Sequence, residues 1–256
     1  MQNNIFYSCI KLNSESIKRE AHTHNSYELI FIYQGQGTYH VEDKYYTISP
    51  YDLIITRPGV HHFIDLKENT VYERINILVE YNSSLSYHLK KNINNHDIID
   101  CTNLKNIIDA FNRMRFYHDN LNNDDFSTVL KSLIIEIAIN LQLIGKENTN
   151  TPKSTVPIIT QALDYINENL FTIQNVSEIS SSLFISKNYL ISVFKENLDI
   201  TPMKYINNKR LIKAQKRLLK GEKPTKIYSE CGFNNYVTFY KAYTNLFGHS
   251  PSDDFS

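Results

Sequence analysis

The sequence predicts a two-domain α+β protein, with an antiparallel β-barrel and two helices followed by an all-α domain. Short β-branched and aromatic runs dominate residues 27–81, which is typical of strands. Apolar residues recur at helical spacing through residues 158–247, and a polar stretch with two prolines, residues 145–157, separates the two patterns. A chain of 256 residues is long enough for both domains to bury a core.

The first domain is expected at residues 1–148, with its barrel at about 1–82 and its helices at about 84–145. The predicted strands are Tyr27–Tyr33, Gly37–Val41, Tyr45–Ser49, Leu53–Thr56 and Tyr72–Glu80. Glycine, proline and acidic turns separate these strands by hairpin-length breaks, which favours an antiparallel barrel or jelly roll.

A histidine motif lies inside the predicted barrel. His22-Thr-His24 precedes Glu28 and Gly35, and Pro58-Gly59 leads to His62. Strand alternation places His22 and His24 on one face, as chelation requires. The pattern resembles the two cupin motifs, in which the matching positions His22, His24, Glu28 and His62 would be metal ligands.

The motif departs from the cupin pattern, because the glycine usual before its first part is missing and Tyr51 replaces the one before its second. We therefore expect no metal or other cofactor, and interpret these side chains as structural or effector-lining. The expected effector-lining residues are His22, His24, Glu28, Tyr39, Arg57 and His62. A metal site on His22, His24, Glu28 and His62 is the alternative.

Two amphipathic helices are expected at about residues 103–118 and 126–144. Leu104, Ile107, Ile108, Phe111 and Met114 mark the first, and Phe126, Val129, Leu130, Leu133, Ile134, Ile137 and Leu141 mark the second. Both helices could pack on the barrel, or form a homodimer seam as coiled-coil positions do. A linker follows at residues 149–157.

The net charge of zero hides an asymmetry between the two domains. Residues 1–152 carry 14 basic and 18 acidic side chains, while residues 153–256 carry 13 and 9. Nine lysines and arginines against one acid fall between Met203 and Lys226. This run predicts a phosphate-facing surface, with an ordinary solvated face as the alternative.

The second domain, at residues 158–256, contains two predicted helix-turn-helix units joined by a linker helix. In the second unit, Gly232 supplies the turn, and Phe239, Tyr243 and Phe247 mark the buried face of the following helix. In the first unit, Ser186 caps a helix with Leu190, Val193 and Phe194 inward. The linker helix, Pro202 to Lys220, would span about 28 Å, near the 34 Å between successive major grooves.

These residues resemble the AraC/XylS-type transcription regulators. The linker helix matches at Pro202, Tyr205-Ile206, Arg210-Leu211, Ala214 and Leu218-Leu219. The second unit matches at Ile227, Gly232-Phe233, Phe239, Lys241, Tyr243, Phe247-Gly248 and Ser250-Pro251-Ser252. The first unit matches at Ile185-Ser186, Tyr189-Leu190 and Phe194-Lys195. Ser192 stands where many members have arginine, and Tyr228 replaces a small alanine. The resemblance implies double-stranded DNA as partner and homodimerisation through the first domain.

The expected DNA contacts are outward-facing side chains of both units and the linker helix. They are Lys187, Asn188, Ile191, Ser192, Lys195, Lys213, Lys216, Asn234, Asn235, Tyr236, Val237, Tyr240 and Lys241. We interpret the protein as a transcription regulator controlled by a small-molecule effector or by dimer contacts at the barrel. The alternatives are a metal-dependent cupin oxygenase or isomerase using the four motif residues, and a DNA-binding protein whose barrel only dimerises.

The expected location is the cytoplasm. Cys9, Cys101 and Cys231 are an odd, widely spaced set that forms no disulfide framework, which fits a reducing compartment. Residues 1–16 lack the apolar region of a signal peptide, and no apolar run reaches about 18 residues, so no membrane partner is expected.

Overall fold

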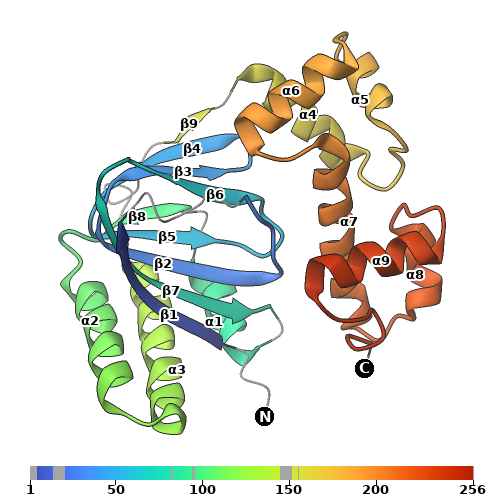
Figure 1. The fold of residues 1–256 in the computed structure, drawn as a ribbon. Helices are drawn as coiled ribbons and strands as arrows, with labels where there is room; N and C mark the ends of the chain where they lie inside the picture. The colour runs from blue at the N-terminus through green and yellow to red at the C-terminus, as the bar shows by residue number, and fades with distance from the viewer. Residues whose placement is uncertain are drawn as a thin grey trace.

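The computed structural model describes residues 5–13, 21–81, 83–93, 96–144, 152–154 and 156–255. The prediction of no signal peptide, at residues 1–16, falls partly outside these ranges, as does much of the predicted linker. The N-terminal domain is built from two antiparallel sheets with helices on one side, and the C-terminal domain is helical (Figure 1). The predicted α+β architecture is therefore confirmed.

The strands of the N-terminal domain form a five-stranded and a four-stranded antiparallel sheet. The first has the order β1 (Ile5–Asn13), β7 (Val71–Glu80), β2 (Ser26–Gln34), β5 (Asp52–Thr56) and β8 (Ile98–Asp100). The second has the order β6 (His62–Leu66), β3 (Gly37–Val41), β4 (Lys44–Ile48) and β9 (Lys153–Ser154). Strands β1, β6, β8 and β9 were not predicted, and β9 extends the second sheet from within the predicted linker.

The barrel interior is filled by apolar side chains from both sheets. Alternation along β2 sends Ile30 and Ile32 into the barrel and Leu29 and Phe31 to the opposite face. The fully or almost fully buried interior group is Ile30, Ile32, Tyr39, Val41, Tyr46, Ile48, Ile54, Tyr72 and Ile98. Tyr51 stands where the cupin pattern has a glycine. Its backbone is left-handed (φ 69°), a conformation that favours glycine.

Three helices cover the outer face of the five-stranded sheet. They are α1 (Ser84–Asn92), α2 (Lys105–Asn120) and α3 (Asn123–Asn140), with a short 3₁₀ turn η2 (Leu141–Leu143). Phe111 of α2 stacks on Phe31 of β2, with ring centroids 4.4 Å apart. The apolar stripes of α2 and α3 thus pack on the barrel, as one of the two alternatives predicted.

One segment, Asn123–Leu143, is long and apolar enough by length and composition alone to cross a membrane. Here it is a core helix of the N-terminal domain, because Leu133, Ile134, Ile137 and Leu141 are buried against the sheet and its neighbouring helices. From the sequence, no apolar run of about 18 residues was expected, so this helix was not foreseen as a segment of that length.

Six helices form the C-terminal domain. They are α4 (Pro157–Glu168), α5 (Val176–Ser182), α6 (Lys187–Leu198), α7 (Pro202–Leu218), α8 (Pro224–Glu230) and α9 (Tyr236–Phe247). The predicted helices are confirmed to within about two residues at each end. Ser186 and Asn235 cap α6 and α9 with their side chains, as the sequence indicated.

The C-terminal domain has two apolar cores, and α7 contributes to both. Tyr205 and Ile206 belong to the core shared with α4, α5 and α6, while Leu211 and Leu218 belong to the core shared with α8 and α9. At Gly232 the backbone is left-handed (φ 81°), and a Cβ atom would lie 2.6 Å from the carbonyl oxygen of Phe171. This glycine is required both by its conformation and by the close approach.

Candidate functional site

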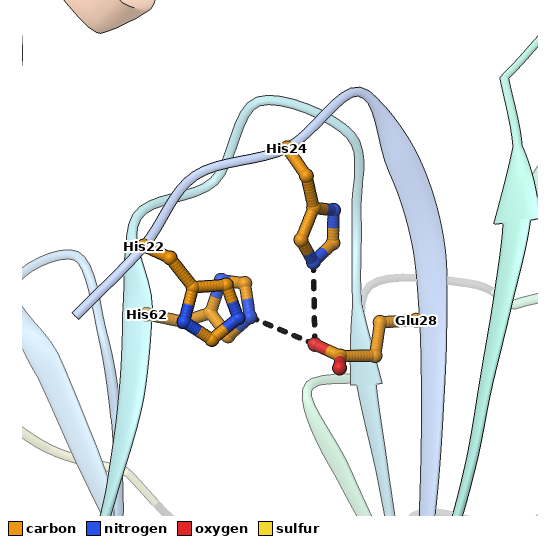
Figure 2. A group of neighbouring side chains, drawn as sticks. All are labelled: His22, His24, Glu28 and His62. Carbon is orange, nitrogen blue, oxygen red and sulfur yellow. Dashed lines mark hydrogen bonds and ion pairs between the residues drawn. The ribbon is translucent and has the colours of Figure 1, made fainter. Parts of the chain in front are cut away.

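The structure brings the four motif side chains together at one end of the barrel. His22, His24, Glu28 and His62 each offer a ligand atom, and these atoms all lie within 4.8 Å of one another (Figure 2). An isolated antiparallel bridge holds His22 beside His62, with backbone hydrogen bonds of 3.1 Å in both directions. His62 and Glu28 are buried, whereas His24 is partly exposed and His22 is exposed.

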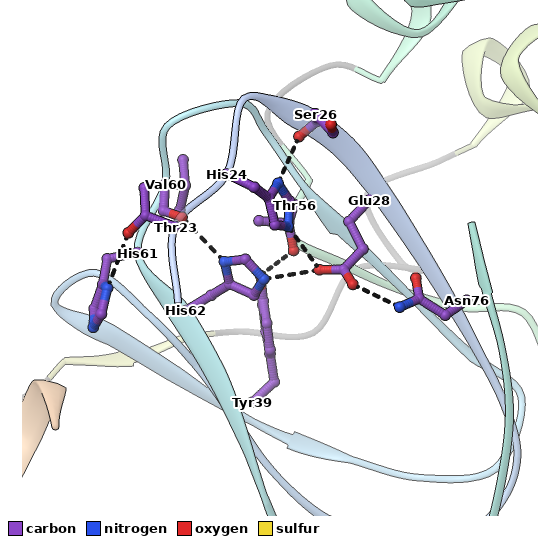
Figure 3. Close-up of polar contacts among 10 residues, drawn as sticks. All are labelled: Thr23, His24, Ser26, Glu28, Tyr39, Thr56, Val60, His61, His62 and Asn76. Atoms are coloured by element: carbon purple, nitrogen blue, oxygen red, sulfur yellow. Dashed lines mark hydrogen bonds and ion pairs between the residues drawn. The ribbon is translucent and has the colours of Figure 1, made fainter. Parts of the chain in front are cut away.

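Hydrogen bonds orient three of the four side chains (Figure 3). The Nδ1 atom of His62 lies 3.0 Å from the carbonyl oxygen of Val60, and that of His24 lies 3.2 Å from the carbonyl oxygen of Ser26. The Nε2 atoms of His62 and His24 lie 2.8 and 3.3 Å from Oε2 of Glu28. The other carboxylate oxygen of Glu28 accepts a hydrogen bond from Asn76 at 2.8 Å.

Burial sets the electrostatics of this cluster. It lowers the pKa of His62 to about 4, against the opposing effect of Glu28. Burial also acts to raise the pKa of Glu28, but the two histidines outweigh it and bring that pKa well below its usual value. Glu28 is therefore an anion at neutral pH, next to a neutral His62.

The other two expected effector-lining residues have separate partners. Tyr39 is fully buried beneath the cluster, donates or accepts a hydrogen bond of 2.7 Å with Thr56, and has its ring centroid 6.2 Å from that of His62. Arg57 binds Asp97 and the carbonyl oxygen of His96 instead. The structure thus brings Tyr39 under the cluster and directs Arg57 elsewhere.

The expected DNA contacts of the first unit lie on α6. Lys187, Asn188, Ser192 and Lys195 are exposed, while Ile191 is half-buried against the core of the unit. The hydroxyl of Ser192 donates a hydrogen bond of 2.6 Å to Glu196 on the same helix. The turn before α6 also exposes Phe184 almost completely, a residue that the sequence analysis did not single out.

The second unit presents a corresponding surface at the start of α9. Asn234, Asn235, Val237, Tyr240 and Lys241 are exposed. Asn235 uses its side chain to cap α9, and the half-buried Tyr236 packs edge-on against Tyr228, with ring centroids 5.8 Å apart. The large residue at 228 therefore packs between the two helices of the unit.

The two units are held together by the buried guanidinium of Arg210 on α7. Its three nitrogens donate to the carbonyl oxygens of Leu170, Ile173 and Gly232, at 2.7, 2.5 and 3.0 Å. The first two acceptors follow α4 and the third lies in the turn between α8 and α9. One side chain therefore joins both units through α7.

One face of α7 docks on the barrel. Its residues Tyr205, Lys209, Ile212 and Lys216 follow helical spacing. Tyr205 donates a hydrogen bond to the carboxylate of Glu42 in the turn between β3 and β4, and Lys209 binds the same carboxylate at 2.5 Å. The ammonium of Lys216 lies 4.4 Å from the ring centroid of Tyr81, at the end of β7.

A histidine of the barrel also contacts the end of α6. The Nε2 atom of His61 lies 2.7 Å from the carbonyl oxygen of Leu198, and its Nδ1 atom lies 3.1 Å from the hydroxyl of Thr23. Burial lowers the pKa of His61. Since a carbonyl only accepts, the neutral ring donates from Nε2 and accepts the Thr23 proton at Nδ1.

The structure separates two lysines that the sequence analysis grouped as phosphate contacts. Lys213 is exposed, whereas Lys216 lies on the docked face, where burial, followed by the charges of Lys213, Lys209 and Lys90, lowers its pKa to about 8. The roles of Glu42 and His61 were not predicted from the sequence. The spacing of Tyr205, Lys209, Ile212 and Lys216 was the available sign of a docked face.

Comparisons with known proteins agree with a barrel domain followed by a helix-turn-helix domain. A family model described as an AraC-like ligand binding domain matches residues 7–105, and one described as a helix-turn-helix domain matches residues 179–255. The raffinose operon transcriptional regulatory protein RafR of Pediococcus pentosaceus is 24% identical over 242 residues, covering 89% of this chain and 84% of RafR. The transcriptional activator RhaS of Escherichia fergusonii is 22% identical over 247 residues, covering 91% and 86%.

A shorter match has higher identity. The probable transcriptional regulator LumQ of Photobacterium leiognathi is 32% identical over 90 residues. The match covers 35% of this chain and 36% of LumQ.

A ligand-binding barrel followed by two helix-turn-helix units defines a class of proteins, the ligand-responsive transcription regulators. Within that class, a matched AraC-like ligand binding domain followed by a matched helix-turn-helix domain is the arrangement of an AraC-type transcription regulator. The relatives are named as transcription regulators or activators. This favours a regulator over the metal-dependent enzyme considered from the sequence.

Proposed function

We propose that the protein is a cytoplasmic, sequence-specific DNA-binding regulator whose barrel holds the C-terminal domain in an arrangement of low DNA affinity. The docking of α7 is the observation that carries this proposal. Lys209 and Lys216 lie on the barrel in this arrangement, so they are not available to phosphates. Docking and full contact with DNA therefore compete, and an effector that changes one changes the other.

The exposed surfaces of α6 and α9 support the DNA-binding part of the proposal. We assign base contacts to Asn188 and Lys241, because asparagine reads adenine and lysine reads guanine in the major groove. We assign phosphate contacts to Lys187, Lys195 and Lys213, all of which are exposed. With 17 residues, α7 spans about 25 Å, which suits two helices in successive major grooves.

Exposed apolar side chains on α2 and α3 support homodimerisation through these helices. Phe116 is 61% exposed and Ile139 is 51% exposed, although the inner faces of both helices are buried on the barrel. We propose that this outer surface pairs with a second copy of the chain. Light scattering should give a dimer mass that falls to the monomer mass in a Phe116→Asp variant; a monomeric parent protein would contradict the pairing.

Selection of random DNA duplexes by the purified protein tests the proposed function. We expect enrichment of a bipartite site whose halves lie about one helical turn apart. Binding should weaken as salt rises, because phosphate contacts release counterions. Binding without sequence preference would contradict a sequence-specific regulator, whatever its salt dependence.

A further inference from the structure

We infer that His22, His24, Glu28 and His62 bind a first-row divalent transition metal ion, and that its occupancy is the signal passed to α6. The metal site stands independently, and only the signal to α6 rests on the proposed function. It replaces the expectation, drawn from the sequence, that the cluster holds no metal.

The donor atoms already lie close to a coordination geometry. Ligands about 2.1 Å from a tetrahedral ion lie about 3.4 Å apart, and the four donors here lie within 4.8 Å of one another. Small side-chain rotations would therefore close the site. His22 is exposed to solvent, while Glu28 and His62 are buried.

The hydrogen-bond stereochemistry of the cluster also favours a cation between its side chains. A neutral imidazole carries one N–H, and the Nδ1 atoms of His24 and His62 each face a carbonyl oxygen that can only accept. In the neutral tautomers that donate from Nδ1, the Nε2 atoms direct lone pairs at the same carboxylate oxygen of Glu28. A divalent ion between these atoms turns this repulsion into coordination.

The surrounding contacts are those that tune metal ligands. Metal-binding histidines usually donate their second nitrogen to a carbonyl or carboxylate, which fixes the ring orientation. Val60 and Ser26 supply those carbonyls, and Asn76 holds the carboxylate oxygen of Glu28 that faces away from the histidines. The barrel interior beneath is filled by apolar side chains, which leaves the cluster as the site for a small ion.

The ligand set indicates the class of ion. Three imidazoles and one carboxylate suit Zn²⁺, Fe²⁺, Mn²⁺, Co²⁺ or Ni²⁺. Calcium and magnesium prefer sites made of oxygen ligands.

The same short segments carry the contact with the C-terminal domain. Thr23 lies between His22 and His24, and His61 precedes His62, so alternation turns Thr23 and His61 away from the cluster. Thr23 donates to His61, which donates to the carbonyl of Leu198, the last residue of α6. A metal that fixes His22, His24 and His62 therefore also fixes the group that satisfies the end of α6.

The first experiment measures metal binding by the full-length chain after chelator treatment, using Zn²⁺ and Co²⁺ as probes. We expect one ion per chain and a Co²⁺ absorption spectrum typical of nitrogen and oxygen ligands. Glu28→Gln and His24→Gln should lower affinity by at least tenfold, while His88→Gln on α1 should leave it unchanged.

The Glu28→Gln variant separates a metal site from a purely structural cluster. Its amide can donate to a histidine nitrogen, so the metal-free variant should be at least as heat-stable as the metal-free parent. Absence of stoichiometric binding, or equal affinity in parent and Glu28→Gln, would overturn the metal site.

The second experiment measures DNA affinity with and without saturating Zn²⁺. Because the metal stabilises the docked arrangement, we expect it to weaken DNA binding by on the order of tenfold. Thr23→Val should still bind Zn²⁺ but lose most of that effect. An equal metal effect in Thr23→Val would overturn this route, and no effect in the parent would overturn metal as the signal. Failure to bind DNA at all would instead contradict the proposed function and leave the metal result standing.

Discussion

The two helix-turn-helix units are built alike but are attached differently to the rest of the protein. Each has a side-chain cap before its second helix, Ser186 or Asn235, and a left-handed residue after it, Asp199 or Gly248. The first unit touches the barrel through the carbonyl of Leu198 at the end of α6. The second is tied to α7, through Arg210 to Gly232 and through Gln215 to Asp254.

This difference suggests separate roles for the two units. We propose that a signal from the barrel reaches α6 and the docked face of α7 directly. It reaches α9 only through α7, so the second unit acts as a constant base reader whose position α7 sets.

Replacing Arg210 by alanine should break the connection between the two units. Three buried carbonyls would lose a charged donor, so we expect the C-terminal domain to lose about 3–5 kcal/mol of unfolding free energy. Chemical denaturation measures this loss. Arg210→Lys keeps the charge but not the three-way geometry, and should recover only part of it; full recovery would show that charge alone holds the units together.

Replacing Lys241 by alanine should affect the second unit alone. If Lys241 reads a base, binding should weaken by about 1–3 kcal/mol and preference should relax at one position of the site. The loss should be the same with and without Zn²⁺, because α9 does not receive the barrel signal directly. An equal loss on every sequence would reassign Lys241 to the phosphate backbone.

Replacing Glu42 by glutamine should loosen the docked face of α7. Lys209 would lose its ion-pair partner, so the whole protein should bind its DNA site more tightly, by about fivefold or more. Fluorescence anisotropy with the selected duplex measures this gain. Glu68→Gln, an exposed site on the same domain, is the control; the same gain in that variant would reflect charge alone.

Lys213 and Lys216 should differ although they are three residues apart. Lys213→Ala should weaken binding on all sequences and reduce the salt slope by about one. Lys216→Ala would remove the docked contact with Tyr81 as well as any phosphate contact made after undocking, and these losses oppose each other, so its net effect should be smaller. Equal losses from the two variants would contradict the docked position of Lys216.

The helices and the separate C-terminal domain could be predicted because local signals were strong. Ser186, Gly232 and Asn235 mark caps and turns whose chemistry is local. The four-residue cluster was also predictable as a set, because its spacing matched a known motif. Its hydrogen bonds to Val60, Ser26 and Asn76 were not, since they depend on how loops and a distant strand fold around it.

The docking of the two domains could not be read from the sequence. Glu42 lies in a hairpin turn with left-handed backbone (φ 51°), a conformation that favours glycine or asparagine. Its partners Tyr205 and Lys209 lie more than 160 residues away. The phosphate contacts of the basic run stay a prediction, and charge alone does not distinguish the face with Lys213 from the face with Lys216.

The most direct test of competition between docking and DNA binding compares the whole protein with residues 156–256 on the same selected duplex. The isolated part retains both of its cores, because neither core includes a residue of the barrel. We predict that it binds more tightly than the whole protein, and that Glu42→Gln moves the whole protein toward it. If the whole protein and residues 156–256 bind the duplex equally tightly, both with and without Zn²⁺, control by the barrel is contradicted.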